Sequence, residues 1–487
     1  MKLIGKSTWL TFIGLALVSG LSVVNYFFPA YSLIILVFIG LLVFALAFYR
    51  LEYGVLIAIA ELIIGSKGRL FDQGLVSLRM VIFTAVLAAC LLKIIKERSL
   101  GPLSDFVTKN WIWPWFLALL VFLGLGFLSG LIRSYPLEII FADANSWLFL
   151  GLLIPLIIVY YQAPLSTFER LIQVLSGALL WLIGETFFIL FAFTHSLPFI
   201  SDLYWWLRKT GLAEVTATAG SWSRIFFQSH LYPALAVVIL PFVKIKQRSA
   251  LIVLNSFSWG VLILSMSRSF WLAVAFALGS GILMLLIWRR WRFLIQVLLK
   301  VLVPAILGFV LIFATAAFPF PDPGKISTEA FSNRLEIDSE EPAVASRWSL
   351  LGPLWGAIKE HWFLGSGFGR EIVYETSDPR FLDMQETSTY RTYAFEWGYF
   401  GIWLKIGILG LLSYLIILAY LFIKNLQRWR AGDNLAGSLA LALLALLVIH
   451  FFTPYLDHPL GFLVWFLIWI ISQNQARLLN NLPEITK

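Results

Sequence analysis

Charged residues are scarce in this chain of 487 residues. They make up 13% of it, while hydrophobic residues make up 60%; soluble domains average about 25% charged and about 45–50% apolar residues. A water-soluble fold of this composition could not keep its apolar surface away from water. The composition therefore excludes an ordinary soluble globular protein and indicates an integral membrane protein.

Cysteine is almost absent as well. Cys90 is the only one and falls inside an apolar segment, which excludes an intrachain disulfide and a thiolate metal site. The five histidines show no metal-ligand spacing, so we expect no metal and no cofactor. The net charge of +9 comes from short clusters between apolar segments rather than from one face or stripe, so we expect no nucleic acid as a partner.

Long apolar runs dominate what is present. A helix needs about 20 apolar residues to cross a bilayer, and continuous runs favour helices over barrel strands. The sequence predicts an all-α, polytopic transmembrane helical bundle of about 12–14 helices, with the segment at 51–65 unusually short. The candidate segments are 8–28, 31–49, 51–65, 76–95, 110–132, 145–161, 170–194, 231–246, 249–266, 269–288, 293–318, 399–423, 434–453 and 457–473.

Basic residues collect in four places between these segments. Counting the helices in order puts all four clusters on one side of the membrane, which the positive-inside rule makes cytoplasmic. Both termini then lie in the cytoplasm. The clusters are Lys93, Lys96 and Arg98; Lys244, Lys246 and Arg248; Arg289, Arg290 and Arg292; and Lys424, Arg428 and Arg430.

The same count places two long loops outside. The chain divides into N-terminal transmembrane helices at 1–194, an outer loop at 195–230, transmembrane helices at 231–318, a long extracytoplasmic loop at 319–398, and C-terminal transmembrane helices with a short cytoplasmic tail at 399–487. The second loop is too long for a mere connection. Apolar residues recur in it at helical spacing from Trp348 to Trp362, which predicts an amphipathic helix and a partly helical loop.

Two arginines stand on the outer side, against the positive-inside trend. Arg224 comes just before the segment at 231–246, and Arg268 lies in a very short outer hairpin. A single arginine at an interface is ordinarily a snorkelling anchor. Guanidinium groups also match phosphate bidentately, so the pair indicates one outer-facing site for a lipid diphosphate.

Four motifs follow one another in the C-terminal half. They are Ser223-Arg224 with Phe227-Gln228-Ser229-His230 and Leu240-Pro241; Ser267-Arg268-Ser269; Arg347-Trp348 continuing through His361 to Gly365-Ser366-Gly367-Phe368-Gly369; and Glu396 to Leu404 with Gly407-Ile408-Leu409-Gly410. By itself the glycine turn is a weak signal, since a plain loop has the same composition. Together the motifs resemble the O-antigen ligase and O-antigen polymerase group of bacterial membrane glycosyltransferases.

The resemblance implies an enzyme of the bacterial cytoplasmic (inner) membrane. It would transfer a glycan, without a metal, from a polyprenyl diphosphate-linked glycan to a hydroxyl group of a lipid or glycan acceptor, with membrane lipids as further partners. A repeat-unit polymerase of the same family, or a transporter or flippase for lipid-linked glycans, is the alternative. The substrate-binding residues that it implies are Arg224, Arg268, Arg347, Gly365, Gly367 and Gly369.

The sequence departs from the family where a base is expected. The family usually has His-Asn where this chain has Glu396-Trp397, and it often has a glutamate where this chain has Lys405. A carboxylate can act as a general base, so Glu396 is the candidate catalytic residue. An acid at a membrane surface is ordinarily just solvated, and His230 and His458 are the next candidates.

Ionisable residues inside predicted membrane segments are functional suspects by default. Two of them, Arg79 and Lys300, have a structural alternative, in which they snorkel or pair within the bundle. The set comprises Glu61, Arg79, Glu185, Lys300 and Lys405.

Overall fold

The computed structural model describes residues 2–72, 74, 76–97, 101–217, 223–243, 245–319, 342–376 and 389–480. In these ranges the regular structure is helical, apart from two short antiparallel hairpins. Ten of the described helices are long and apolar enough to cross a membrane. The predicted all-α polytopic bundle is thereby confirmed.

The N-terminal part of the chain contributes six of these spans. Its short helix α3 has 14 residues, of which 12 are buried, so protein rather than lipid surrounds it. The elements are α1 (Lys6–Phe27), η1 (Pro29–Tyr31), α2 (Ser32–Tyr49), α3 (Leu51–Ile64), α4 (Leu78–Glu97), α5 (Gly101–Lys109), α6 (Trp113–Ile132), α7 (Leu137–Ala144), η2 (Asn145–Leu152), α8 (Leu153–Tyr160) and α9 (Leu165–Thr194).

The C-terminal part contributes the other four spans and both hairpins. Its elements are α10 (Ile200–Thr210), β1 (Glu214–Ala217), β2 (Ser223–Phe226), η3 (Gln228–His230), α11 (Leu231–Ile239), η4 (Leu240–Phe242), α12 (Arg248–Leu264), α13 (Arg268–Ile287), α14 (Trp291–Ala317), α16 (Pro342–Glu360), β3 (Ile372–Glu375), β4 (Thr389–Thr392), α18 (Gly398–Arg430), α19 (Asn434–Phe452) and α20 (Pro459–Asn480).

Each of the fourteen predicted membrane segments contains one of these helices. Ten coincide with the long spans, and the segment at 51–65 coincides with α3. The other three coincide with shorter apolar helices at Gln228–Phe242, Arg248–Leu264 and Pro459–Asn474. Hydrophobic length alone was therefore enough to find the bundle.

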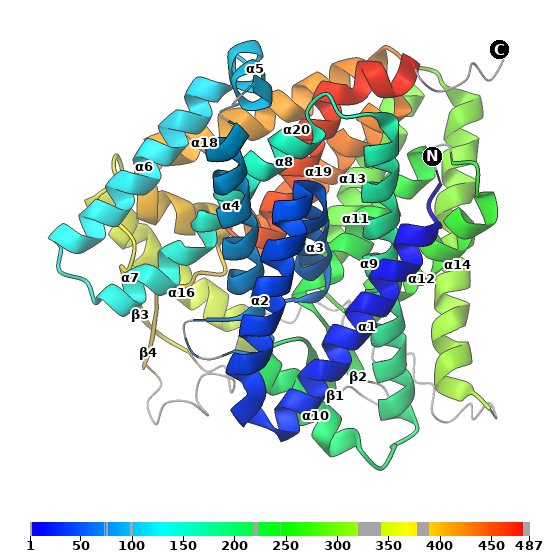
Figure 1. Cartoon of the computed structure of the whole chain (residues 1–487), viewed down its shortest axis with the longest axis horizontal. Helices are drawn as coiled ribbons and strands as arrows, with labels where there is room; N and C mark the ends of the chain where they lie inside the picture. Colours follow the sequence, from blue (N-terminus) through cyan, green and yellow to red (C-terminus); the bar gives the residue numbers. More distant parts are fainter. Residues whose placement is uncertain are drawn as a thin grey trace.

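The basic turns gather at one end of the bundle, the upper end in Figure 1. The amides of Leu3 and Ile4 donate to Oε1 of Gln247, at 2.8 and 2.9 Å, in the turn before α12. Arg290, before α14, donates at 2.8 Å to the carbonyl of Arg430, where α18 ends. Helix α10 and the β1–β2 hairpin lie at the opposite end. Which end faces the cytoplasm stays a prediction.

The two predicted outer loops contain more structure than their sequences indicated. The amphipathic helix is present as α16, but the loops also hold α10 and the hairpins β1–β2 and β3–β4. Helix α10 is short and strands of four residues carry little periodic signal, so a search for long apolar runs passes over them. Residues 320–341 and 377–388, together with Arg98 and Lys244 of the basic clusters, lie outside the described residues.

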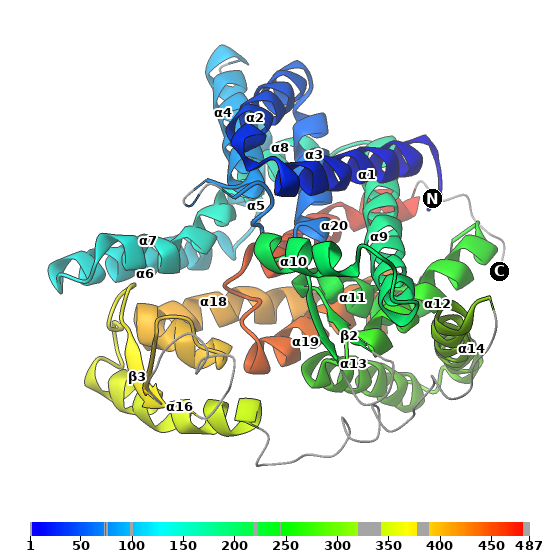
Figure 2. The same cartoon turned by 90° about the horizontal axis from the view of Figure 1, so that it is seen from below.

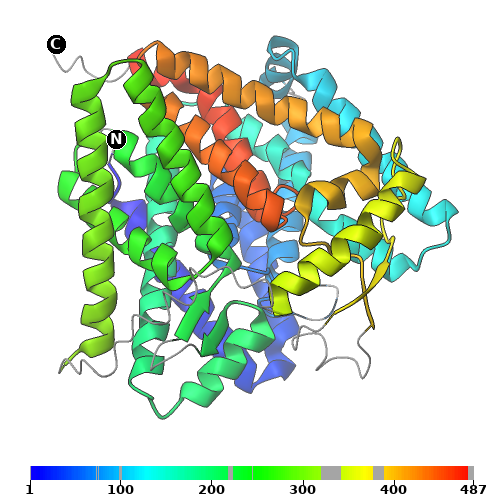
Figure 3. The same ribbon diagram turned by 180° about the vertical axis from the view of Figure 1, so that it is seen from behind.

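Helix α18 is broken near its start, which the sequence did not predict. Gly407 has φ 71° and ψ 176°, so the chain changes direction there before it continues to Arg430 (Figure 3). The short first part of α18 carries a second, smaller hydrophobic core with α16 and β3, and these elements lie side by side in Figure 2. The break thus separates the part of α18 that packs on the long loop from the part that packs in the bundle.

The topology can be tested with two exposed serines at opposite ends of the bundle. Ser201 lies in the first turn of α10, and Ser249 lies in the first turn of α12. In a Cys90→Ala background, Ser201→Cys should react with an impermeant maleimide added to spheroplasts, and Ser249→Cys should react only after permeabilisation. The reverse labelling pattern would invert the orientation.

Candidate functional site

Arg224 and Arg268, the two arginines predicted to face outward, lie at one turn. Arg224 is the second residue of β2, and its Nε donates a hydrogen bond of 3.0 Å to the carbonyl of Ser265. Ser265 follows α12 directly, and Arg268 opens α13 three positions later. Both arginine side chains are half-buried. The structure therefore brings Arg224 to the turn that carries Arg268, while a common diphosphate site stays a prediction.

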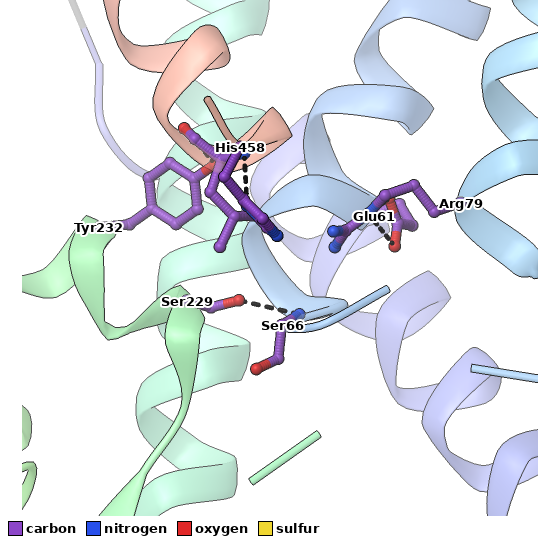
Figure 4. Close-up of polar contacts among 7 residues, drawn as sticks. Glu61, Ser66, Arg79, Ser229, Tyr232 and His458 are labelled. Carbon is purple, nitrogen blue, oxygen red and sulfur yellow. Dashed lines mark hydrogen bonds and ion pairs between the residues drawn. The ribbon is translucent and has the colours of Figure 1, made fainter. Parts of the chain in front are cut away.

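The segment after Arg224 is fixed on both sides. The amide of Gln228 donates to Oγ of Ser66 at 3.0 Å. The amide of Ser66 donates to Oγ of Ser229, also at 3.0 Å (Figure 4). Tyr455, in the loop between α19 and α20, donates at 2.9 Å to the carbonyl of Gln228. The β1–β2 hairpin, which carries Arg224, is thus held between the α3–α4 loop and the α19–α20 loop.

A buried ion pair lies beside this contact (Figure 4). Nε of Arg79 donates to both carboxylate oxygens of Glu61, at 3.2 and 3.0 Å, and each side chain is 5% exposed. An unpaired charge at this depth would be strongly destabilising. Arg79 therefore pairs within the bundle, which is the structural alternative that its sequence context allowed.

His230 and His458, the next candidates for the general base, are poorly suited to this role. Burial, assisted by the positive charge of Arg79, lowers the pKa of His458 to about 3. The Nδ1 atom of His458 accepts a hydrogen bond of 3.3 Å from the amide of Leu460, so its other ring nitrogen carries the proton of the neutral form. His230 is fully buried, with Nε2 3.0 Å from Oγ1 of Thr186.

The predicted outer loop at 319–398 contains helix α16. Its aliphatic residues Leu354 and Ile358 are buried against β3 and the start of α18, while the large side chains of Trp348, on the same helix, and of Trp362, just after its end, are exposed. Exposed tryptophans on such a helix are typical of a membrane interface. The predicted amphipathic face therefore packs on protein through its aliphatic residues and leaves aromatic residues outward.

The loop brings two predicted site residues into contact. Nε of Arg347, on α16, donates to Oε2 of Glu396, just before α18. The indole of Trp397 donates at 2.9 Å to the carbonyl of Arg347. Arg347 and Glu396 are 38% and 36% exposed, so solvent reaches both. Both residues were predicted separately from the sequence, and in the structure they form an ion pair.

The glycine turn is buried between helices. Gly365, Gly367 and Gly369 have φ values of 84°, 89° and 86°, which residues other than glycine rarely adopt. A Cβ atom on Gly367 would lie 2.6 Å from the amide nitrogen of Gly130 on α6. The glycines are therefore required by the left-handed backbone and by its close approach to α6.

All five amides of this turn have partners inside the protein. Those of residues 365 to 368 donate to backbone carbonyls, at 2.6 to 3.2 Å, and that of Gly369 donates at 2.9 Å to Oδ2 of Asp143. None is left to cradle a phosphate. The structure gives the turn a packing role, and substrate binding by Gly365, Gly367 and Gly369 stays a prediction.

A second buried ion pair joins this region to α7. Nζ of Lys405, on α18, contacts Oδ1 of Asp143, and their side chains are 8% and 2% exposed. Nζ also lies 5.6 Å from the ring centroid of Phe395, the residue before Glu396. Lys405 was identified from the sequence, but Asp143 was not, because the predicted membrane segment began at residue 145. The signal that could have identified Asp143 is an acidic residue only two positions before an apolar run.

Asp457 adds a further acid close to Lys405. Burial raises the pKa of its carboxyl group to about 6, although the positive charge of Lys405 opposes the shift. Its Oδ1 atom is buried without a hydrogen-bond partner among the described residues. Asp457 and His458 are neighbours in the α19–α20 loop, so adjacent residues of this loop approach Lys405 and Arg79.

Two other ionisable suspects have different environments. Nζ of Lys300 donates to the carbonyls of Pro241 and Val243, at 3.2 and 3.4 Å, where η4 ends. Lys300 thereby completes the end of a short helix. Glu185, in the middle of α9, is 8% exposed, and its Oε2 atom has no hydrogen-bond partner in the described part of the chain. In that same part, no three His, Cys, Asp or Glu residues gather to hold a metal ion.

The glycine turn offers a direct test of its packing role. Gly367→Ala should lower the free energy of unfolding by about 2 kcal/mol or more, because a Cβ atom meets α6 and the positive φ is strained. Gly356→Ala is the control, since Gly356 is exposed inside α16 and a Cβ atom there meets nothing within 4 Å. Thermal unfolding in detergent measures both; equal melting temperatures would contradict the packing role.

Comparison with known proteins gives a family match for part of the C-terminal half of the chain. Residues 252–415 match the family described as O-antigen ligase. No curated protein matches the chain. The matched range includes Arg268, Arg347, the glycine turn and Glu396, and it leaves out Arg224 and Asp143. Through this stretch, the chain is similar to the O-antigen ligase family, which supports the resemblance that its motifs predicted.

Proposed function

We propose that this protein transfers a glycan from a polyprenyl diphosphate carrier to a hydroxyl group of a lipid or glycan acceptor, at the outer face of the bacterial inner membrane. The observation that carries the proposal is the hydrogen bond from Arg224 to Ser265. It holds one guanidinium group at the turn that carries the second, Arg268. The β1–β2 hairpin, which carries Arg224, lies at the end of the bundle opposite to the basic turns.

The proposed reaction is a displacement at the anomeric carbon of the carrier-linked sugar. The acceptor oxygen forms a bond to this carbon, and the bond from the carbon to the diphosphate oxygen breaks. The carrier diphosphate leaves with the electron pair, and Arg224 and Arg268 stabilise its negative charge through charge-assisted contacts. The proton of the acceptor hydroxyl group passes to Glu396.

The ion pair with Arg347 suits Glu396 to this role. The guanidinium group engages Oε2 of Glu396, while Oε1 has no hydrogen-bond partner among the residues described. One carboxylate oxygen is then oriented, and the other is available to the acceptor hydroxyl group. Arg347 is in this proposal a positioning residue rather than a ligand of the substrate.

A transporter for lipid-linked glycans is the alternative from another class. Broken membrane helices are typical of transporters, where the freed backbone groups line a substrate site. Helix α18 is broken at Gly407, but the carbonyls of Leu404 and Lys405 accept hydrogen bonds from Ser366 and Gly367. The break is filled by the glycine turn, which favours the transferase. A polymerase of the same family differs only in its acceptor.

The arginines should be sensitive to the shape of the cation as well as to its charge. Arg224→Lys and Arg268→Lys should each weaken binding of a polyprenyl diphosphate by about tenfold or more, because an ammonium group cannot make the bidentate contact. Arg292→Lys is the control, since Arg292 is an exposed arginine at the other end of the bundle. Binding can be measured with the purified protein in nanodiscs. Unchanged carrier affinity in Arg224→Ala and Arg268→Ala would remove the diphosphate site.

Glu396→Gln should reduce the transfer rate by about 10²- to 10⁴-fold, the usual contribution of a general base. Carrier binding should be retained, because an amide oxygen can still accept from Arg347. The matched control is Glu371→Gln, which removes another carboxylate that faces an arginine on the same loop, Arg391 at 3.7 Å. The assay follows release of carrier diphosphate and identifies the glycosylated acceptor.

A third variant separates catalysis from ion pairing. If the pair only holds the loop, Arg347→Gln and Glu396→Gln should lose activity equally. If Glu396 is the base, Glu396→Gln should lower kcat far more than Arg347→Gln does. Transfer at the parental rate by Glu396→Gln would end the proposal for this residue.

A further inference from the structure

A cavity of about 330 Å³ lies at the end of the bundle opposite to the β1–β2 hairpin. It is open on one side and is lined by the turn between α2 and α3, the last turns of α4, the end of α8 and the start of α9. A volume of this size is within the range of small-ligand sites. Its polar lining consists of Arg50, Glu52, Cys90, Lys93, Glu97 and Thr167.

The cations of this region outnumber the anions. Glu52 is held by two arginines: its Oε2 lies 2.6 Å from Nη2 of Arg50, and its Oε1 lies 2.5 Å from Nε of Arg170. One carboxylate therefore compensates only one of the two guanidinium charges. Within the described ranges, Lys93 has no hydrogen-bond or ion-pair partner, and Glu97 is exposed at the rim. The cavity lining itself holds two positive and two negative side chains. With Arg170, which contacts Glu52 from outside the lining, the local net charge is +1.

Two helix N-termini add to this positive potential. Helix α3 begins at Leu51 and α9 begins at Leu165, and neither has a side-chain cap on its first amides. Leu51 and Glu52 of α3, and Pro164 and Thr167 around the start of α9, line the cavity. The helix dipole favours an anion at such an N-terminus.

The apolar surroundings distinguish a lipid from a soluble anion. Ile94, Ile158 and Val159 share the lining with the charged residues. On the same stretch of α4, Leu92 and Ile95 are 46% and 69% exposed, as expected of side chains that face acyl chains. A ligand in this cavity therefore meets cations beside an apolar helix surface.

We propose that this cavity binds a membrane phospholipid through its phosphate group, which Arg50 and Lys93 contact, with the glycerol and first acyl carbons against Ile94 and Ile158. Basic pockets between membrane helices on the predicted cytoplasmic side suit phospholipid headgroups. The site is separate from the glycan-transfer proposal and does not depend on it.

Native mass spectrometry of the purified, delipidated protein tests the site, with phosphatidylglycerol, phosphatidylethanolamine or inorganic phosphate as the probe. The protein should retain phospholipid, and the double variant Arg50→Gln/Lys93→Gln should bind it about tenfold more weakly or worse, because two charge-assisted contacts are lost. The matched control is Lys96→Gln/Arg292→Gln, which removes two charges at the same end of the bundle outside the cavity.

Lys93→Gln alone keeps the test valid if loss of Arg50 disturbs Glu52. Lys93 has no polar partner among the described residues, so this variant should keep the parental melting temperature and still bind phospholipid more weakly. Equal phospholipid binding by the parent, the double variant and Lys93→Gln would overturn the proposal. Displacement of the phospholipid by inorganic phosphate at equal concentration would also overturn it, because the site would then be one for a soluble anion.

Discussion

A bilayer offers no partner to a backbone amide or carbonyl, so a membrane protein has to satisfy each of these groups itself. Where α18 breaks at Gly407, its carbonyls at Leu404 and Lys405 lose their helical partners and accept hydrogen bonds from Ser366 and Gly367 instead. The loop that carries α16 is therefore attached to the bundle by main-chain hydrogen bonds. The direction of the first part of α18, and with it the positions of Glu396 and Lys405, depends on this junction.

Buried charges follow a related rule, because an ion in a low-dielectric interior is stable only with a partner. Glu61 with Arg79 joins α3 to α4, and Asp143 with Lys405 joins α7 to α18. The loop between α19 and α20 approaches both pairs, through His458 and Asp457. The same loop contacts the segment just after the β1–β2 hairpin through Tyr455, which donates to the carbonyl of Gln228. Three regions distant in the sequence, including the β1–β2 hairpin that carries Arg224, are thus organised around one short loop.

The sequence was a good guide wherever apolar length or a helical period carried the signal. It located a helix in every predicted segment and the amphipathic helix α16, because burial in lipid and against protein imposes those patterns directly. It named Arg347 and Glu396 but not their ion pair, which depends on how α16 packs on α18. The break at Gly407 and the partner of Lys405 were not predicted either. Both arise from contacts between segments far apart in the chain, and no local pattern encodes such contacts.

The stretch that matches the O-antigen ligase family is not a separable unit. Lys405 lies within it and Asp143 outside, and the amide of Phe368 donates to the carbonyl of Gly126 on α6. A chimera that exchanged residues 252–415 alone would pair a foreign loop with native α6 and α7. Such exchanges would preserve the fold only if the small residues of α6 and the acid of α7 travelled with the loop. Divergence in this family is therefore expected to be correlated across the two halves of the chain, so that a change of the glycine turn is matched by a change on α6.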